Sequence, residues 1–350
     1  MSSLGLGQPL PDDDFTPQTF SIAFDPRDEE EVLKRWQEIL RGQRWSFGPN
    51  TEEFEALWAD ATGLTSISFA NWSGGALAAL DFFGVAGERV LCPSNTFLAT
   101  PRSVEHSGGE VVYYDCNRSD LCGAYDDFVA KAEQCEPKAA WIVHVGGHIA
   151  FDIERIAAFC RDKGIALLED CAHAHGAHWH GKKAGSWGDA GIYSFYPTKT
   201  ISSGEGGMLV TVNPDLAKHA RSYRDYGRGS NYQVSSLNHR MSEFTAALGA
   251  VQTRRLDEIV GWKQRYAKNV LTPRFPNHVQ LPDGMESGYY KFIVFDRVEP
   301  STGKVYDHPC HKLLGDESVL PNTDWVADNH WCVPIYYPRD PQALEEGGES

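Results

Sequence analysis

The sequence predicts an α/β fold, in which a mostly parallel sheet carries helices on both faces and a smaller C-terminal α/β domain follows. Two observations lead to this prediction. Short apolar runs of strand length alternate with amphipathic helical segments across residues 66–224. The apolar run 165–168 ends in the acid pair Glu169 and Asp170, which is how a buried parallel strand reads when it delivers a carboxylate at its carboxyl end.

The 350 residues are enough for two domains. We place the larger domain at 1–255, with a loosely ordered arm over 1–20. The smaller domain takes 256–350, where the pattern changes to short strands and turns.

Periodicity and capping residues define the elements before the acid pair. Apolar residues at helical spacing, with acids in the first turn, predict the first helix, and Thr51 is assigned as N-cap of the second. In order we expect helices at 28–40 and 51–62, a strand at 66–70, a helix at 76–83, strands at 90–93 and 109–115, a helix at 125–134, a strand at 139–145 and a helix at 151–163.

After strand 165–168 the alternation continues and then gives way to helices. Pro273 interrupts the last of these helices. The expected elements are strands at 191–195 and 208–212, helices at 214–224, 242–259 and 262–271, and a strand at 289–295.

A single lysine stands at the tip of the loop that follows strand 191–195. Pro197 disfavours helix at Tyr196 and turns the chain out of the sheet, which leaves Lys199 at the loop tip. A lysine and a strand-end aspartate in one site suit pyridoxal phosphate (PLP) chemistry. The lysine amine forms a Schiff base with the cofactor aldehyde, and the aspartate keeps the pyridine nitrogen protonated. For an arbitrary pair, a solvated lysine and a helix-capping aspartate are the commoner outcome, and composition alone does not decide between the two.

Four spaced motifs surround this lysine: E-D-x-A-x-x-x-G, G-x-x-x-G-x-x-G-D, S-F-x-x-x-K and G-E-G-G. They occupy residues 169–176, 181–189, 194–199 and 204–207. In this series the chain resembles the DegT/DnrJ/StrS family of sugar aminotransferases. The resemblance implies the PLP-dependent transferase fold of type I. It makes Lys199 the Schiff-base lysine and Asp170 the partner of the pyridine nitrogen.

The resemblance also implies contacts around the cofactor ring. His173 stands where the family usually has glutamine, as partner of the phenolic oxygen, and because histidine titrates near neutrality we expect an altered pH profile. Ser194 is implied as a phosphate ligand. Phe97, in a stretch similar to the family's P-x-x-T-F-x-A-T, is implied to lie flat against the ring, with simple core packing as the alternative.

Small residues before the helix at 76–83 form a candidate phosphate site, because N–H groups are exposed at the positive end of a helix dipole. The family usually has S-G-T there, whereas this chain has Ser73, Gly74 and Gly75, so the contact is expected from Ser73 or from the backbone alone. Asn238 lies in a stretch that looks like the family's N-x-R-M-x-x-x-x-A-A. The resemblance implies that it reaches the phosphate held by the neighbouring subunit, and hence a homodimer with shared active sites.

By resemblance the chain moves an amino group from an amino acid donor, glutamate, to a keto group of a nucleotide-linked sugar, with the pyridoxamine phosphate (PMP) form arising during turnover. Three alternatives stay open. The first is the same chemistry on a cyclitol or other small keto ring. The second is a PLP- or PMP-dependent sugar dehydratase, against which Lys199 argues because that branch carries histidine there. The third is a non-catalytic regulatory relative. Residues 256–350 match the family poorly, which leaves the acceptor undefined.

The net charge of −16 argues against nucleic acid or an anionic membrane as a general partner. An anionic substrate then needs a locally basic pocket. Four arginines are candidates for it, with a solvated helix face as the alternative: Arg221, Arg224, Arg228 and Arg240. There is no apolar run near twenty residues and the N-terminus is polar and acidic, so we expect a cytoplasmic protein.

The cysteines and histidines raise the question of a metal. The eight cysteines show no C-x-x-C spacing, which argues against a zinc site or a disulfide framework. Four histidines fall within eight residues: His173, His175, His178 and His180. No acidic or cysteine ligand stands at the usual spacing from them, and His173 already has a role beside the cofactor, so we expect no metal.

Overall fold

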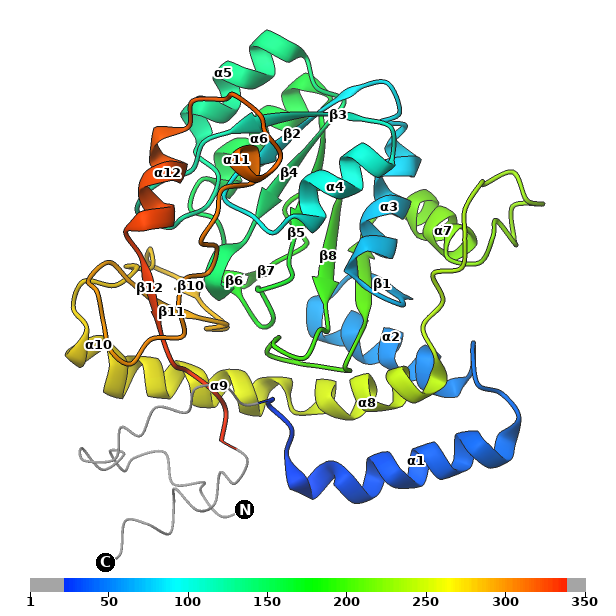
Figure 1. Cartoon of the computed structure of the whole chain (residues 1–350). Helices are drawn as coiled ribbons and strands as arrows, with labels where there is room; N and C mark the ends of the chain where they lie inside the picture. Colours follow the sequence, from blue (N-terminus) through cyan, green and yellow to red (C-terminus); the bar gives the residue numbers. More distant parts are fainter. Residues whose placement is uncertain (1–21, 339–350) are drawn as a thin grey trace, which may run out of the picture.

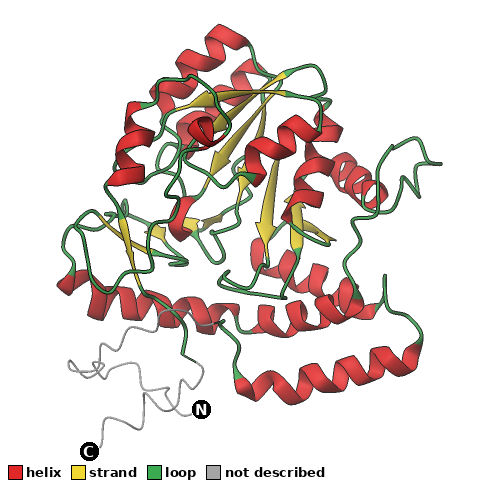
Figure 2. Cartoon of the chain, viewed as in Figure 1, coloured by secondary structure: helices red, strands yellow, loops and turns green. Residues whose placement is uncertain are grey.

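A seven-stranded sheet forms the centre of the protein. The computed structural model describes residues 22–338, so the predicted arm at 1–20 lies outside the described residues. The strand order is β1-β9-β8-β5-β4-β2-β3. Figure 2 shows the strands in yellow and the helices around them in red. The strands are β1 (Thr65–Phe69), β2 (Arg89–Pro93), β3 (Glu110–Tyr114), β4 (Ala139–Val143), β5 (Ala166–Asp170), β8 (Ala190–Ser194) and β9 (Gly207–Thr211). Only β9 runs antiparallel to its neighbours in this sheet, which confirms a mostly parallel sheet.

Helices cover both faces of the sheet, as predicted. One face carries α3 (Trp72–Phe83), α4 (Ala99–His106) and α7 (Pro214–Tyr223), and the other carries α2 (Pro49–Thr62), α5 (Tyr125–Cys135) and α6 (Ile153–Lys163). Successive residues of a strand point to opposite faces. Thus Trp141 in β4 joins the core of the first face and Ile142 joins the core of the second. Both faces of the sheet are therefore shielded from solvent, which explains why the sequences of these strands are continuous apolar runs.

Two predicted helix starts were wrong. Helix α3 begins at Trp72, where the Asn71 side chain accepts the N–H of Gly74, so the small residues 73–75 lie inside the first turn and not before the helix. Helix α2 begins at Pro49 after Gly48, so Thr51 lies within its first turn and is not the N-cap. Its cap comes from another helix, which sequence spacing could not reveal.

The remaining chain forms a long helical line and a smaller sheet region. Helices α8 (Glu243–Arg254) and α9 (Leu256–Tyr266) run one after the other below the sheet in Figure 1, with α1 (Glu29–Gly42) beneath them. The predicted helix 242–259 is thus two helices, meeting at Arg255. Pro273 lies inside the short helix α10 (Thr272–Arg274) instead of ending helical structure. Among the helices of residues 22–338, none is long and apolar enough to cross a bilayer.

The C-terminal part has a small core of its own and also packs back onto the main sheet. Strands β11 (Phe292–Val294) and β12 (Trp331–Val333) pair antiparallel, and β6 (His178–Trp179), β7 (Lys182–Lys183) and β10 (Met285–Glu286) form a three-stranded sheet. The short helices α11 (Cys310–Leu313) and α12 (Pro321–Asp328) form hydrogen bonds with Ser94 and Asp115, the residues that follow β2 and β3. The division at 255/256 stays a prediction.

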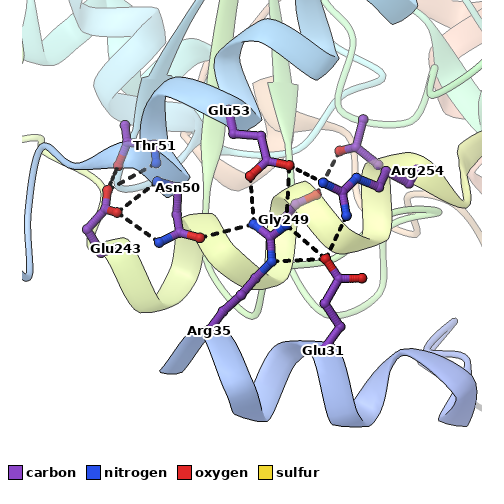
Figure 3. A network of polar contacts seen from close by, with 9 residues as sticks. Glu31, Arg35, Asn50, Thr51, Glu53, Glu243, Gly249 and Arg254 are labelled. Carbon is purple, nitrogen blue, oxygen red and sulfur yellow. Dashed lines mark hydrogen bonds and ion pairs between the residues drawn. The ribbon is translucent and has the colours of Figure 1, made fainter. Parts of the chain in front are cut away.

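A polar network joins α1, α2 and α8 (Figure 3). The buried Glu243 carboxylate of α8 accepts the N–H groups of Gly48, Asn50 and Thr51 at 2.9–3.0 Å, and so caps helix α2 from outside. Arg35 of α1 bridges Glu31 and Glu53, and Arg254 of α8 pairs with both acids. The three helices are thereby fixed together on one side of the sheet.

The contact between α2 and α8 should be sensitive to a single methyl group. Cβ built on Gly249 of α8 lies 2.5 Å from the Phe54 ring of α2, and this ring is fully buried. We expect Gly249→Ala to lower the free energy of unfolding by about 1–3 kcal/mol, the usual cost of overpacking. The midpoint of urea unfolding measures this. Gly42→Ala is the control, because Cβ on Gly42 meets nothing within 4 Å. Equal midpoints for the two variants would contradict the expectation.

Candidate active site

The carboxyl edge of the sheet brings the predicted aspartate and lysine together. Asp170 is the last residue of β5, and Lys199 follows the end of β8, the next strand of the sheet. Burial lowers the pKa of Lys199 to about 8, the negative charge of Asp170 opposes this, and the positive charge of Lys291 adds to it. A lysine with such a pKa holds a useful fraction of neutral, nucleophilic amine near neutral pH.

The Asp170 carboxylate is held in a fixed orientation. Thr100 Oγ1 donates to Oδ2 at 3.1 Å, and the N–H of Ala172 donates to Oδ1 at 3.0 Å. Burial raises the pKa of Asp170, while these two hydrogen bonds and the charge of Lys199 favour the ionised form. Each oxygen keeps a lone pair for a further donor. The carboxylate can therefore accept an N–H from a ligand at this edge.

The neighbouring Glu169 organises the loop between β5 and β8. Its fully buried carboxylate accepts the N–H groups of Gly185, Trp187 and Gly188, each at 2.7 Å, and pairs with His144 Nε2 at 2.8 Å. His144 Nδ1 accepts the N–H of Ala150, so Nε2 carries the hydrogen. The backbone of the G-x-x-x-G-x-x-G-D stretch thus folds around the Glu169 carboxylate. Any Cβ at Gly188 would lie 2.4 Å from a carbonyl oxygen.

Tyr290, from the C-terminal part, completes the lysine site and was missed by sequence reasoning. Its ring stacks on His173 at 4.1 Å, its hydroxyl lies 3.0 Å from Thr198 Oγ1, and Lys199 Nζ lies 4.9 Å from the ring centre. Tyr306 stacks on the same imidazole at 5.7 Å. The only signal for Tyr290 was its place in the predicted strand 289–295, and Tyr306 lies in a loop without any pattern.

His173 lies in the site but differs from its expected behaviour. Burial lowers its pKa well below the ordinary value, with Lys199 and Lys291 adding to the shift, so it is neutral near pH 7. The expected change of pH profile from a histidine that titrates near neutrality is therefore corrected. His173 Nδ1 accepts the N–H of Gly146 at 3.4 Å, which leaves the hydrogen on Nε2. Nε2 can then donate a hydrogen bond to a ligand.

The other predicted cofactor residues lie at the same edge or on elements that border it. Phe97 is 65% exposed, so it is not core packing, and it stands three residues before Thr100, the partner of Asp170. Ser194 is buried at the end of β8. Ser73 is exposed in the first turn of α3.

Gly74, Gly75 and Asn238 have different surroundings. The N–H of Gly74 is used by Asn71, and Cβ on Gly75 would meet the buried side chains of Ile192 and Leu209, so Gly75 faces the core. This favours Ser73 over the glycines as a phosphate contact. Asn238 is exposed on the loop after α7, which projects from the right side of Figure 1.

These residues fit PLP as a set. The cofactor aldehyde requires an amine of lowered pKa, and its pyridine nitrogen requires a carboxylate with a free lone pair. Its phosphate requires a helix N-terminus with a hydroxyl, and its ring face an exposed aromatic ring. Lys199 would hold the aldehyde carbon, Asp170 the ring nitrogen, and Ser73 with Ser194 the phosphate.

The clustered histidines go to separate surroundings. His175 packs among the rings of Trp58, Tyr193 and Phe195, whereas His178 lies 3.4 Å from Glu286. His180 stacks with Trp179. These histidines, although close in sequence, thus pack against different side chains.

The four arginines are engaged in ion pairs. Arg221 and Arg224 both bind the largely buried Glu55, and Arg240 binds Asp225. Arg221 also lines an open cavity of about 410 Å³ with Lys218 and Arg228. Glu55 and Asp225 neutralise much of the expected basic patch, so these arginines contribute first to holding α7 and its loop in place.

Comparison with known proteins was consistent across sequence and structure. The profile described as DegT/DnrJ/EryC1/StrS aminotransferase family matches residues 26–275. The chain is 28% identical, over 91% of its length and 93% of the relative, to dTDP-3-amino-3,4,6-trideoxy-alpha-D-glucose transaminase of Micromonospora megalomicea subsp. nigra. It is 32% identical, over 90% and 91%, to a pleiotropic regulatory protein of Geobacillus stearothermophilus. A DegT DnrJ EryC1 StrS aminotransferase from Brucella abortus superposes with a TM-score of 0.83 at 22% identity, over 91% of this chain and 94% of that one, which shows the fold.

The lowered pKa of Lys199 predicts the pH dependence of its reaction with an aldehyde. A pKa of about 8 leaves the amine increasingly neutral as pH rises through that value, whereas an ordinary lysine stays charged until about pH 10. We expect PLP uptake by protein stripped of cofactor, followed by visible absorbance, to speed up as the pH rises through 8 and to level off above about pH 9. Asp170→Asn removes a charge that raises this pKa, so its midpoint should shift to lower pH. A rate still rising at pH 10 in the unsubstituted protein would contradict the assignment.

Proposed function

The chain belongs to the DegT/DnrJ/EryC1/StrS aminotransferase family, and from this premise we propose that it moves an amino group from glutamate to a keto group of a nucleotide-linked sugar. The observation that carries the proposal is that the Asp170 carboxylate and a Lys199 amine of lowered pKa lie at one edge of the sheet, where their charges interact. Aminotransferase activity follows from the family. The donor and the acceptor are the proposed parts.

The chain's own residues have defined roles in this chemistry. Bound PLP supplies the electron-accepting ring. Asp170, fixed by Thr100 and Ala172, keeps the ring nitrogen protonated. The Lys199 amine would be the general base and acid that moves the proton at the substrate carbon. A pKa near 8 suits both directions of that transfer.

Two further residues orient the reacting groups. His173, neutral and with its hydrogen on Nε2, would donate to the phenolic oxygen of the cofactor, as glutamine does in the family pattern. Tyr290 lies over both His173 and Lys199 and limits the positions that the lysine amine can take. The small region beyond residue 256 thus contributes to the reacting end of the site.

The acceptor substrate and the homodimer are inferred from a relative's name and from the surface of the chain. The relative in Micromonospora megalomicea carries the name of a transaminase for a dTDP-linked sugar, which favours a nucleotide-linked acceptor here. A homodimer with shared sites is supported by the projecting loop that carries Asn238, and by the partly exposed rings of Phe47 and Tyr226 beside Arg240. Such rings beside an arginine are typical of a protein interface. A cytoplasmic location completes the proposal.

The absorption spectrum tests the proposal first. We expect a visible band that depends on Lys199, that is absent in Lys199→Ala, and that bleaches when glutamate is added at neutral pH. Lys218→Ala, a change of an exposed lysine on α7, is the control and should keep the band.

A protein that takes up no PLP would overturn the proposal and favour a regulatory role, which the name of the Geobacillus relative also suggests for that protein. A band that forms but ignores glutamate would exclude glutamate as the donor while leaving the cofactor assignment intact.

A further inference from the structure

Lys291 is positioned by hydrogen bonds between its own backbone segment and the segment that contains Gly146 and Gly147. The N–H of Lys291 donates to the carbonyl of Gly146, and the N–H of Gly288 donates to the carbonyl of Gly147, both at 2.8 Å. Gly147 has φ +109°, and Cβ there would lie 2.5 Å from the backbone nitrogen of Tyr290. Only glycine allows this approach. The segment bearing Tyr290 and Lys291 is therefore fixed directly above the end of β4.

Two ammonium groups flank one aromatic ring. Lys199 Nζ lies 4.9 Å and Lys291 Nζ lies 5.3 Å from the centre of the Tyr290 ring. The ring faces attract cations, so both amines are stabilised beside Tyr290. The positive charge of Lys291 in turn lowers the pKa of Lys199 and of His173. Lys291 thus stands beside the reacting lysine.

A third lysine adds to the positive charge. Lys263 of α9 is only 4% exposed, and its Nζ donates to the carbonyl of Tyr289 at 3.2 Å. Burial, with a contribution from Lys291, lowers its pKa to about 7. Within residues 22–338, no ion pair joins Lys199, Lys263 or Lys291 to a carboxylate within 4.0 Å. The charge of Asp170 acts on Lys199, whereas Lys263 and Lys291 have no ion-pair partner among the described residues, and a bound anion would supply their counter-charge.

We infer that Lys291 binds a carboxylate of the amino donor and is the donor-recognition residue of this site. The inference rests on the proposed function, since an amino acid must present its nitrogen at Lys199 while its carboxylate lies nearby. The cofactor phosphate is assigned to Ser73 and Ser194 on other elements, so Lys291 remains for the substrate. A lysine suits this role as a mobile point charge on a fixed backbone.

Titration of the visible band with glutamate tests the inference in Lys291→Met. We expect the half-saturating glutamate concentration to rise at least about tenfold, as for loss of one charge-assisted hydrogen bond, with a smaller change in the limiting rate. Lys291→Arg should retain most of the affinity. Lys268→Met, on an exposed lysine of the helical turn after α9, is the control and should match the unsubstituted protein.

Glutarate separates this inference from the proposed function. It has two carboxylates and no amine, so it binds without reacting and shifts the band by occupancy alone. We expect its binding to weaken in Lys291→Met and to persist in Lys268→Met, even if glutamate is not the donor. Equal glutarate and glutamate affinities in Lys291→Met and the unsubstituted protein would overturn the inference, whereas failure of glutamate to bleach the unsubstituted protein would overturn only the proposed donor.

Discussion

The buried carboxylate of Glu169 is the interaction on which the site depends. Three backbone N–H groups and His144 satisfy it at 2.7–2.8 Å in a place without water contact. An unpaired charge there would cost several kcal/mol, so the loop between β5 and β8 must fold around it. The same carboxylate fixes the end of β5, and thereby the direction of Asp170, the next residue. The position of the candidate site thus depends on a carboxylate that is fully buried.

The second constraint is the fit between the glycines after β4 and the strand that carries Tyr290. It joins the matched part of the family fold to the part beyond residue 275 that the family profile does not cover. Residues beyond that point still reach Lys199, because Gly146 and Gly147 let two backbones approach within hydrogen-bond distance. The region beyond residue 275 therefore contributes side chains to the candidate site.

Sequence reasoning succeeded where the determining interactions are local. Strand ends, the Lys199 loop and the Asp170 position follow from apolar runs, a proline and glycines close to one another in the chain. It failed at the start of α2, because the capping carboxylate, Glu243, lies almost two hundred residues away. It also failed for His173, whose pKa is set by burial and by Lys199 and Lys291 on other segments. Tyr290 and Tyr306 could not be predicted, since nothing in the neighbouring residues marks a ring that stacks across the site.

The cap that Glu243 gives to α2, together with the pairing of β1 with β9, has a consequence for the order of biosynthesis. Both contacts join the first quarter of the chain to segments that leave the ribosome more than a hundred residues later. Contacts of such long sequence separation form slowly and only once both partners exist. The edge strand β1 therefore stays without its pairing partner until β9 has been synthesised, and until then its backbone groups are open to pairing with other chains.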